Sequence, residues 1–275
     1  MEKFIITCTL SHVRTGGGSL FLADENLNFL KQCKYDFPEG LQGAVLVGDY
    51  IYVLGGDSLS KPYNDKIYVI DKNTFEVLDL RDELGYGAHG LWHHDGLLYG
   101  VFSEQCQVLV FDVKDLKVLG KIVHKSNRGI YSHVNSIYVD DDLTAITVHN
   151  TNNEGYVYAV GDYTGNRFPI VRNLSQPHDF RLIDNGYIVC NSAKKELIVG
   201  CCPIENSYKI QCFSYTRGVT EDKEFFYVGC SNREGSIGVA KISKLEKRFV
   251  EEYILAREFE GIEVCSELYS IICIN

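Results

Sequence analysis

The chain has 275 residues, 45% of them hydrophobic, and its 27 basic and 37 acidic residues leave a formal net charge of −10 at pH 7. This acidity argues against a nucleic-acid-binding face, which needs clustered Lys and Arg. The sequence contains no run of 18 apolar residues, so no membrane span is predicted. The amino terminus has no cationic stretch followed by a long apolar segment, so we expect a cytoplasmic protein.

Ten cysteines are present, but their positions do not indicate a disulfide framework. Cys8, Cys190 and Cys230, for example, lie in apolar stretches, where a free thiol packs as a small hydrophobic group. No Cys-x-x-Cys pair occurs, and the adjacent Cys201 and Cys202 are poorly placed to bond each other or to bind zinc. We therefore expect reduced thiols, as in other cytoplasmic proteins.

Three apolar stretches open the chain and predict β-strands at residues 4–10, 19–23 and 27–33. The glycine run Gly16-Gly-Gly18 separates the first two strands. Neither Gly-Lys-Ser/Thr nor a helical pattern follows this run, so we interpret it as a hairpin turn and not as a phosphate-binding loop. We expect no nucleotide or flavin cofactor.

Five units of similar layout follow, at residues 42–80, 89–122, 133–172, 178–214 and 217–255. Each opens on a polar residue and reaches an apolar run about ten residues later, as from Gln42 to Tyr52. Short apolar stretches and turn residues then alternate, without a sustained helical period. The opening residues, including one from a looser copy at 260–275, are Gln42, His89, His133, His178, Arg217 and Glu260, spaced 47, 44, 45, 39 and 43 residues apart.

A period near 45 residues, built from short strands, is typical of a β-propeller with one four-stranded antiparallel blade per repeat. The sequence therefore predicts an all-β, six-bladed propeller as a single domain over residues 1–275. In the sixth blade, residues 260–275 would supply the inner portion, at 262–265 and 269–274, and residues 4–33 the outer strands. Because these segments exceed one repeat, residues 4–10 and 269–274 compete for the second-strand position, and the sharing of this blade stays open.

The innermost strands of a propeller start around one mouth of its central channel. The six opening residues are therefore expected to form a ring at that mouth. Asn135 and Asp179 adjoin ring positions, and Tyr86 and Tyr131 are candidates for stacking on a ligand. Loops between the second and third strands open on the same face and would add an outer rim of His12, Asp57, Ser103, Glu104, His149, Asn150, Asn191, Ser231 and Asn232.

Three imidazoles on consecutive blades, those of His89, His133 and His178, are the predicted ligands of a divalent metal such as Mn, Zn, Fe or Ni. Gln42, Glu260 or water would complete the coordination shell. Such a metal polarises a substrate oxygen or lowers the pKa of bound water, which permits hydrolysis or β-elimination. The three histidines can instead act as bases without a metal, with Glu260 as a further acid or base.

Arg217 is the predicted anion-binding group, because a guanidinium binds carboxylate or phosphate with two parallel hydrogen bonds. The expected partner is a small anionic molecule or a peptide in the central channel, and neither a nucleic acid nor a membrane. The oligomeric state stays open. Further substrate contacts are predicted from Gln42, Asn135, Asp179, His149, Asn150, Asn191 and Tyr131.

A simpler interpretation of the ring must be set beside this one. Propeller channels are wet, and polar residues at strand starts often bind only water and neighbouring backbone amides. His93 and His94 are predicted to end an inner strand on the opposite face, His124 to lie on the surface, and Trp92 to pack between blades. These residues are therefore left out of the predicted site.

The run from His89-Gly-Leu to Asp95-Gly-Leu-Leu-Tyr99 resembles the six-bladed propeller superfamily that includes NHL-repeat, gluconolactonase-type and streptogramin-lyase-type proteins. This resemblance covers essentially the whole chain and implies the fold, not an activity. Gln176-Pro-His-Asp with Asn191-Ser192, and Thr216-Arg-Gly-Val, are similar to a bacterial propeller family without an assigned reaction. Oligogalacturonate-lyase-type propellers are similar in kind, with a histidine-based metal site, whereas the acidic calcium ligands of gluconolactonases are not matched.

The leading hypothesis is a propeller enzyme whose His/Arg/Glu pocket at the channel mouth is a metal-assisted lyase or hydrolase. Its substrate would be a small anionic metabolite, a sugar acid or a modified peptide. The alternative is a non-catalytic propeller scaffold that binds a ligand or a protein.

Overall fold

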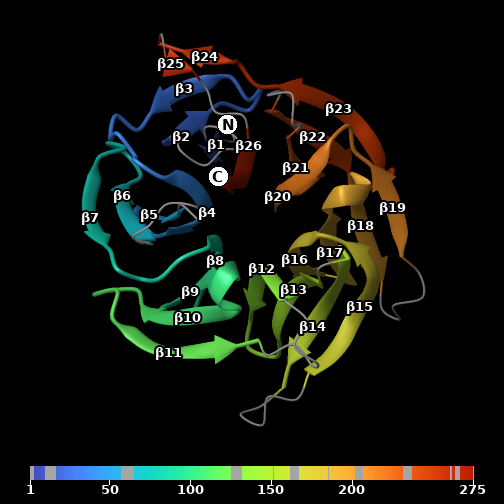
Figure 1. Cartoon of the computed structure of the whole chain (residues 1–275). Coiled ribbons are helices and arrows are strands. Elements are labelled where there is room, and N and C mark those ends of the chain that lie inside the picture. Colours follow the sequence, from blue (N-terminus) through green and yellow to red (C-terminus); the bar gives the residue numbers. More distant parts are fainter. Residues whose placement is uncertain are drawn as a thin grey trace.

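The computed structural model describes residues 3–9, 17–56, 65–124, 132–150, 152–161, 167–184, 186–201, 207–231, 237–260, 262–263 and 267–274. Within them, six four-stranded antiparallel sheets stand around a central axis as the blades of a propeller (Figure 1). The predicted all-β, six-bladed fold is confirmed. No helix in the described part of the chain is long and apolar enough to cross a membrane.

Five blades are each built from four consecutive strands, with the first strand nearest the axis (Figure 1). Blade one contains β4 (Gly40–Val47), β5 (Tyr50–Gly56), β6 (Lys66–Asp71) and β7 (Val77–Arg81). Blade two contains β8 (Ala88–His94), β9 (Leu97–Phe102), a short 3-10 turn η1 (Ser103–Gln105), β10 (Gln107–Asp112) and β11 (Val118–Val123). Blade three contains β12 (Ser132–Val139), β13 (Thr144–Asn150), β14 (Glu154–Val160) and β15 (Arg167–Ser175).

The remaining two of these five blades follow the same plan. Blade four contains β16 (Pro177–Ile183), β17 (Gly186–Asn191), a 3-10 turn η2 (Ser192–Lys194), β18 (Glu196–Cys201) and β19 (Tyr208–Gln211). Blade five contains β20 (Tyr215–Glu221), β21 (Phe225–Ser231), β22 (Ile237–Ser243) and β23 (Arg248–Ile254). The cysteines whose state is described are all free, namely Cys8, Cys33, Cys106, Cys190, Cys212, Cys230 and Cys273.

Aspartates fix several of the tight turns between these strands. Asp71 Oδ1 accepts hydrogen bonds from the backbone N–H groups of Asn73 and Thr74, at 2.8 and 2.7 Å. Asp222 Oδ1 does the same for Glu224 and Phe225, at 2.7 Å each. A short carboxylate that satisfies turn amides in this way stabilises a chain reversal locally.

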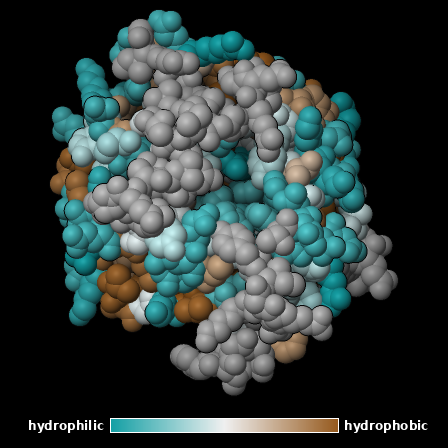
Figure 2. Space-filling model, viewed as in Figure 1, coloured by the Kyte–Doolittle hydropathy of each residue, from teal (hydrophilic) through white to brown (hydrophobic). Residues whose placement is uncertain are grey.

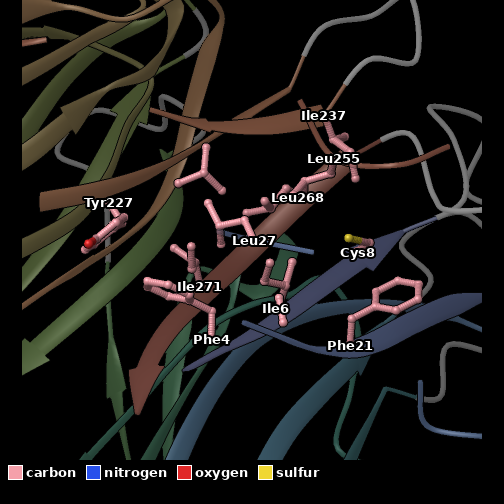
Figure 3. Packing of buried hydrophobic residues seen from close by; sticks show 12 residues of the cluster. Phe4, Ile6, Cys8, Phe21, Leu27, Tyr227, Ile237, Leu255, Leu268 and Ile271 are labelled. Carbon is pink, nitrogen blue, oxygen red and sulfur yellow. The ribbon is translucent and has the colours of Figure 1, made fainter. Parts of the chain in front are cut away.

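The closing blade joins the two ends of the chain in the order β26 (Glu267–Ile274), β1 (Lys3–Thr9), β2 (Gly18–Ala23) and β3 (Phe29–Gln32). β26 is the innermost strand, and its antiparallel pairing with β1 runs from Lys3–Ile274 to Thr9–Glu267. The competition for the second-strand position is thereby resolved in favour of β1. Phe4 and Ile6 of β1 pack with Leu268 and Ile271 of β26 in a buried cluster that also contains Tyr227 of blade five (Figure 3).

The expectation of an inner strand at residues 262–265 is wrong for residues 262–263, and residues 264–265 lie outside the described part of the chain. Residues 262–263 are β25 (Ile262–Glu263), which pairs with β24 (Glu258–Phe259) in a small hairpin outside β3 (Figure 1). The ring of Phe259 lies 6.1 Å from that of Phe21 and 6.0 Å from that of Phe29, edge to face. Burial of this aromatic ring against the outer strands therefore places the segment at the rim.

Glycines in the first strands let neighbouring blades approach closely around the channel. A Cβ atom on Gly43 of blade one would lie 2.4 Å from the backbone nitrogen of Leu91 in blade two. A Cβ atom on Gly90 would lie 2.9 Å from the carbonyl oxygen of Asn135 in blade three. Gly218 has a φ of +68°, and its Cβ atom would lie 3.1 Å from the nitrogen of Ile271 in the closing blade. The repeated glycine after the polar residue is thus a packing requirement of the ring.

The substitution Gly43→Ala should therefore destabilise the propeller. We expect a loss of about 2 kcal/mol in the free energy of unfolding, because backbone atoms of blade two would have to move, and urea titration measures it. Gly120→Ala is the matched control, since nothing lies within 4 Å of a Cβ atom at that position. Equal effects of the two substitutions would show that close approach is not the role of Gly43.

Candidate functional site

The first strand of every blade carries a one-residue bulge, and its position identifies equivalent residues around the channel. The pairing register shifts between Leu41 and Ala44 in β4 and between Ala88 and Leu91 in β8, and β12, β16, β20 and β26 have the same irregularity. The first residue of each bulge, here called the bulge residue, is Gln42, His89, Asn135, Asp179, Arg217 and Tyr269.

Three of the predicted ring positions are corrected by this register. His133 lies two residues before the bulge residue Asn135, and His178 lies one residue before Asp179. In blade four the first hairpin is shorter, with seven residue numbers between the paired Arg181 and Ile188 (188 − 181). The corresponding pair in blade one, Ala44 and Val53, is nine apart (53 − 44), so a constant step of ten misaligns the repeats.

Glu260 does not lie in the ring. It is an exposed turn residue of the β24–β25 hairpin at the rim of the propeller (Figure 1). Its place is taken by Tyr269 of β26, in the segment 269–274 for which the sequence left the second-strand position open. The catalytic role predicted for Glu260 is therefore not supported by its position.

The three predicted histidines nevertheless lie together. The imidazole centroid of His89 is 5.4 Å from that of His133 and 5.1 Å from that of His178. His149 of β13 adds a fourth ring, 4.9 Å from His133, and the ring of Tyr269 lies 5.9 Å from that of His89. Four imidazoles from three neighbouring blades thus form one cluster, here called the histidine cluster.

A hydrophilic hollow lies at the centre of the face shown in Figure 2. Gly56, Gly87 and Ala88, from blades one and two and the chain just before blade two, form part of a small hollow whose cavity volume is about 20 Å³, enough for roughly one water molecule. The side chains that complete its lining are those of Gln42, His89, Ser103, Glu104, His133 and Tyr269. His133 Nδ1 lies 4.0 Å from Glu104 Oε1. The hollow therefore brings imidazole, carboxylate, amide and phenol groups together at the channel.

His178 is held in one protonation state and one orientation. It is 4% exposed, and its Nδ1 lies 3.0 Å from the carbonyl oxygen of Gln176 and 2.8 Å from Ser192 Oγ. Because a carbonyl only accepts, this geometry assigns the proton to Nδ1 and leaves a lone pair on Nε2. Burial lowers the pKa of His178 well below 6.5, and Arg217, His149 and His133 lower it further. Its Nε2 is buried and has no hydrogen-bond partner in the described part of the protein.

Arg217 of blade five is a buried cation beside Tyr269, which is one of the residues that line the hollow. Its guanidinium carbon lies 4.3 Å from the ring centroid of Tyr269 and 4.9 Å from that of Tyr215, and its Nη1 donates to Glu267 Oε2 at 2.9 Å. Burial alone would lower the pKa of Arg217, but these three neighbours raise it overall, so the group stays charged. Its Nε is buried and finds no acceptor among the described residues.

Three of the predicted substrate-binding residues have structural partners. Asn135 Nδ2 donates to the carbonyl of Pro177 at 2.6 Å, and Asp179 Oδ2 accepts from the backbone N–H of Gly218 at 2.7 Å. Burial raises the pKa of Asp179. Asn191 Oδ1 accepts from the N–H of Ser175 at 2.7 Å. Each bond joins one blade to the next, so these side chains position the ring.

The other predicted residues divide into those near the cluster and those outside the description. Gln42 lines the hollow, whereas Asn150 is occupied in its own turn, where its Oδ1 accepts from the N–H groups of Asn152 and Glu154. Ser103 Oγ and Ser231 Oγ bond the strands of the following blades. The backbone N–H of Tyr86 donates to Gln105 Oε1 at 3.3 Å, and the candidates His12, Asp57, Tyr131 and Asn232 lie outside the described residues.

Sequence reasoning missed Tyr215, Glu267 and Tyr269 as members of the site. Tyr215 stands two residues before Arg217, where the side chain of an extended strand faces the same side. Glu267 stands two residues before Tyr269 in the same way. A search for polar residues two positions before each bulge residue would have found both Tyr215 and Glu267, and also His133.

The predicted metal site stays a prediction. In the part of the chain that the structure describes, no three His, Cys, Asp or Glu side chains are arranged to hold a metal ion. The lone pair on His178 Nε2 is nevertheless of the kind that a metal or a substrate proton would occupy.

Acid should weaken the fold through His178. Because its pKa is lowered in the folded chain, the unfolded chain binds a proton more readily. The stability contributed by neutral His178 is therefore present above its ordinary pKa of 6.5 and is lost as the pH falls below that value. We expect Tm to fall less steeply from roughly pH 7 to pH 5 in His178→Gln than in the unsubstituted protein.

The control for this measurement is Gln42→Ala, which removes a side chain of the hollow that does not titrate. It should lower Tm by a similar amount at every pH. The assignment of the acid effect to His178 fails if His178→Gln keeps the full slope.

No family model and no curated protein matches the sequence. Among solved structures, the chain is similar to one in the "Crystal structure of Nidogen/Laminin Complex", with a TM-score of 0.69, 12% identity and coverage of 99% of this chain and 98% of that chain. It is equally similar to a protein of unknown function from Bacteroides caccae, with a TM-score of 0.69, 10% identity and coverage of 100% and 99%. A putative 6-phosphogluconolactonase from Bacteroides fragilis gives a TM-score of 0.64, 10% identity and coverage of 100% and 98%. At these identities the likeness concerns the fold alone, and that fold is the six-bladed β-propeller.

Proposed function

We propose that the channel mouth is the active site of a lyase that acts on a small carboxylate-bearing molecule by general acid–base catalysis. The observation that carries this proposal is the lone pair of His178 Nε2, which is buried, uncharged and without a partner among the described residues. His178 acts as the base, Arg217 binds the carboxylate, and His133 supplies a proton.

The environment of His178 suits a base. Its lowered pKa keeps the imidazole neutral at pH 7, and its Nδ1 bonds fix the ring so that Nε2 points its lone pair at one place. Ser192, which is fully buried, is part of this support. A positioned base of this kind contributes about 10²- to 10⁴-fold to a proton transfer.

Arg217 supplies the matching positive charge. Its Nε–H is a buried donor without a protein acceptor in the described chain, and its proximity contributes to the lowered pKa of His178. A substrate carboxylate bound there has its neighbouring carbon close to the base. Removal of a proton from that carbon places negative charge on the carboxylate oxygens, where a fixed cation stabilises it.

The proposed step is a β-elimination. His178 Nε2 takes the proton from the carbon next to the carboxylate, and the electron pair forms a C=C bond as the bond to the β-oxygen breaks. The leaving oxygen takes a proton from His133, which faces His89 at 5.4 Å and lies 4.0 Å from Glu104. The products are an unsaturated acid and an alcohol, so atoms and electrons balance.

The metal-assisted form of the reaction is the related prediction from sequence. A Mn, Zn, Fe or Ni ion on the histidine cluster would polarise the substrate carboxylate. Hydrolysis of a lactone by an activated water is a second reaction open to such a site. Both forms depend on His178 Nε2 and are separated from the metal-free form by the metal content of the purified protein.

The first test is turnover of uronate oligomers and lactones, followed by the ultraviolet absorbance of the unsaturated acid. His178→Gln should lower kcat/KM by at least about 100-fold, because the base is lost while the shape of the side chain is largely kept. Glu260→Gln is the matched control, since Glu260 lies exposed in the rim hairpin, and it should leave activity unchanged. Elemental analysis of untagged protein, in parallel, decides whether a metal takes part.

Unchanged activity in His178→Gln would refute the role of His178. If no such substrate is turned over or bound, the propeller is a binding scaffold, and a protein partner becomes the object of the search.

A further inference from the structure

Glu267 is placed where a ligand's carboxylate would be expected. Its Oε2 accepts from Arg217 Nη1 at 2.9 Å, and the two side chains are 14% and 16% exposed. Glu267 begins β26, two residues before Tyr269, whose ring lies 4.3 Å from the same guanidinium. The closing blade therefore contributes both a carboxylate and an aromatic ring to the cation of blade five.

The surroundings of Arg217 restrict how an anion can approach it. Two tyrosine rings lie against the guanidinium, and a carboxylate binds a guanidinium in its plane, through the N–H groups at its edge. One edge donor, Nη1, is already bonded to Glu267, while the buried Nε has no acceptor among the described residues. A carboxylate that used the guanidinium fully would therefore meet the charge of Glu267.

We infer that Glu267 is the specificity-determining residue of the site, an internal counter-ion that a ligand carboxylate must displace or approach against repulsion. This inference rests on the proposed function of Arg217 as the anion-binding group. When one carboxylate replaces another on the same cation, the ion pair contributes little net affinity. Selection then falls on the rest of the ligand.

The chemistry around Arg217 indicates which ligands can succeed. The histidine cluster, Gln42 and Tyr269 offer hydrogen-bonding groups to hydroxyls, as sites for polyhydroxy compounds do. A polyhydroxy acid, such as a uronic acid, makes these contacts together with its carboxylate. A simple carboxylate such as acetate does not. Glu267 thus selects sugar acids over small carboxylates.

The test is binding of galacturonate, galactose and acetate to the whole protein, measured by isothermal titration calorimetry. The unsubstituted protein should bind galacturonate and show little affinity for acetate. Glu267→Gln keeps the shape but removes the competing charge, so galacturonate should bind on the order of tenfold more tightly and acetate should become measurable. Galactose, which has no charge, should bind as before.

Two further variants separate this role from others. Glu104→Gln removes a carboxylate of the hollow that lies 4.0 Å from His133, and it should give a much smaller gain. Glu267→Gln combined with Arg217→Met should lose the gain. A structural role for Glu267 predicts weaker binding when it is substituted, so unchanged or weakened galacturonate binding in Glu267→Gln overturns the inference, as does an equal gain in Glu104→Gln.

Binding and turnover fail independently in this design. If galacturonate binds more tightly to Glu267→Gln but no substrate is turned over, the selectivity role holds and the lyase proposal falls. If turnover depends on His178 but Glu267→Gln binds galacturonate no better, the lyase proposal holds and the role of Glu267 falls.

Discussion

The antiparallel pairing of β1 with β26 is the constraint on which the rest of the molecule depends. It joins residues from opposite ends of the sequence in one sheet, and it leaves the ring without an open gap between blades. Each blade then packs on two neighbours, so the buried faces of all six sheets are covered. Loss of this pairing would expose apolar sheet surface on blade one and blade five at once.

Bulges and glycines at the channel convert this closed ring into a site. A bulge turns the side chain of one residue per blade toward the axis, and the glycine beside it in blades one, two and five allows the next blade to come close. Bonds such as Asp179–Gly218 and Asn135–Pro177 then lock neighbouring first strands. The polar groups that remain without such duties, above all His178 Nε2 and Arg217 Nε, are the ones we assign to a ligand.

The sequence predicted the number of blades well because strand periodicity and turn residues recur in every repeat. It was harder to predict which residue of each first strand belongs to the ring, because this depends on the pairing register of that strand to within one residue. The shorter first hairpin of blade four shifted the alignment from Asp179 to His178, although both residues lie at the channel. Glu260 was chosen because the sixth repeat is the least regular, and the attachment of Phe259 to Phe21 and Phe29 is a long-range contact that no local pattern reveals. Pairings such as Arg217–Glu267 could not be predicted from sequence periodicity for the same reason, because they join residues far apart in the chain.

The position of Glu267 and Tyr269 on the innermost strand of the closing blade also bears on how the protein folds. β26 follows every other strand along the chain, yet it must pair with the first, and contacts of such large sequence separation form slowly. Arg217 meets its two partners only when that pairing exists. A chain in which five blades have formed and the sixth has not therefore lacks a complete anion-binding group. The site becomes complete only when the pairing of β26 with β1 closes the ring.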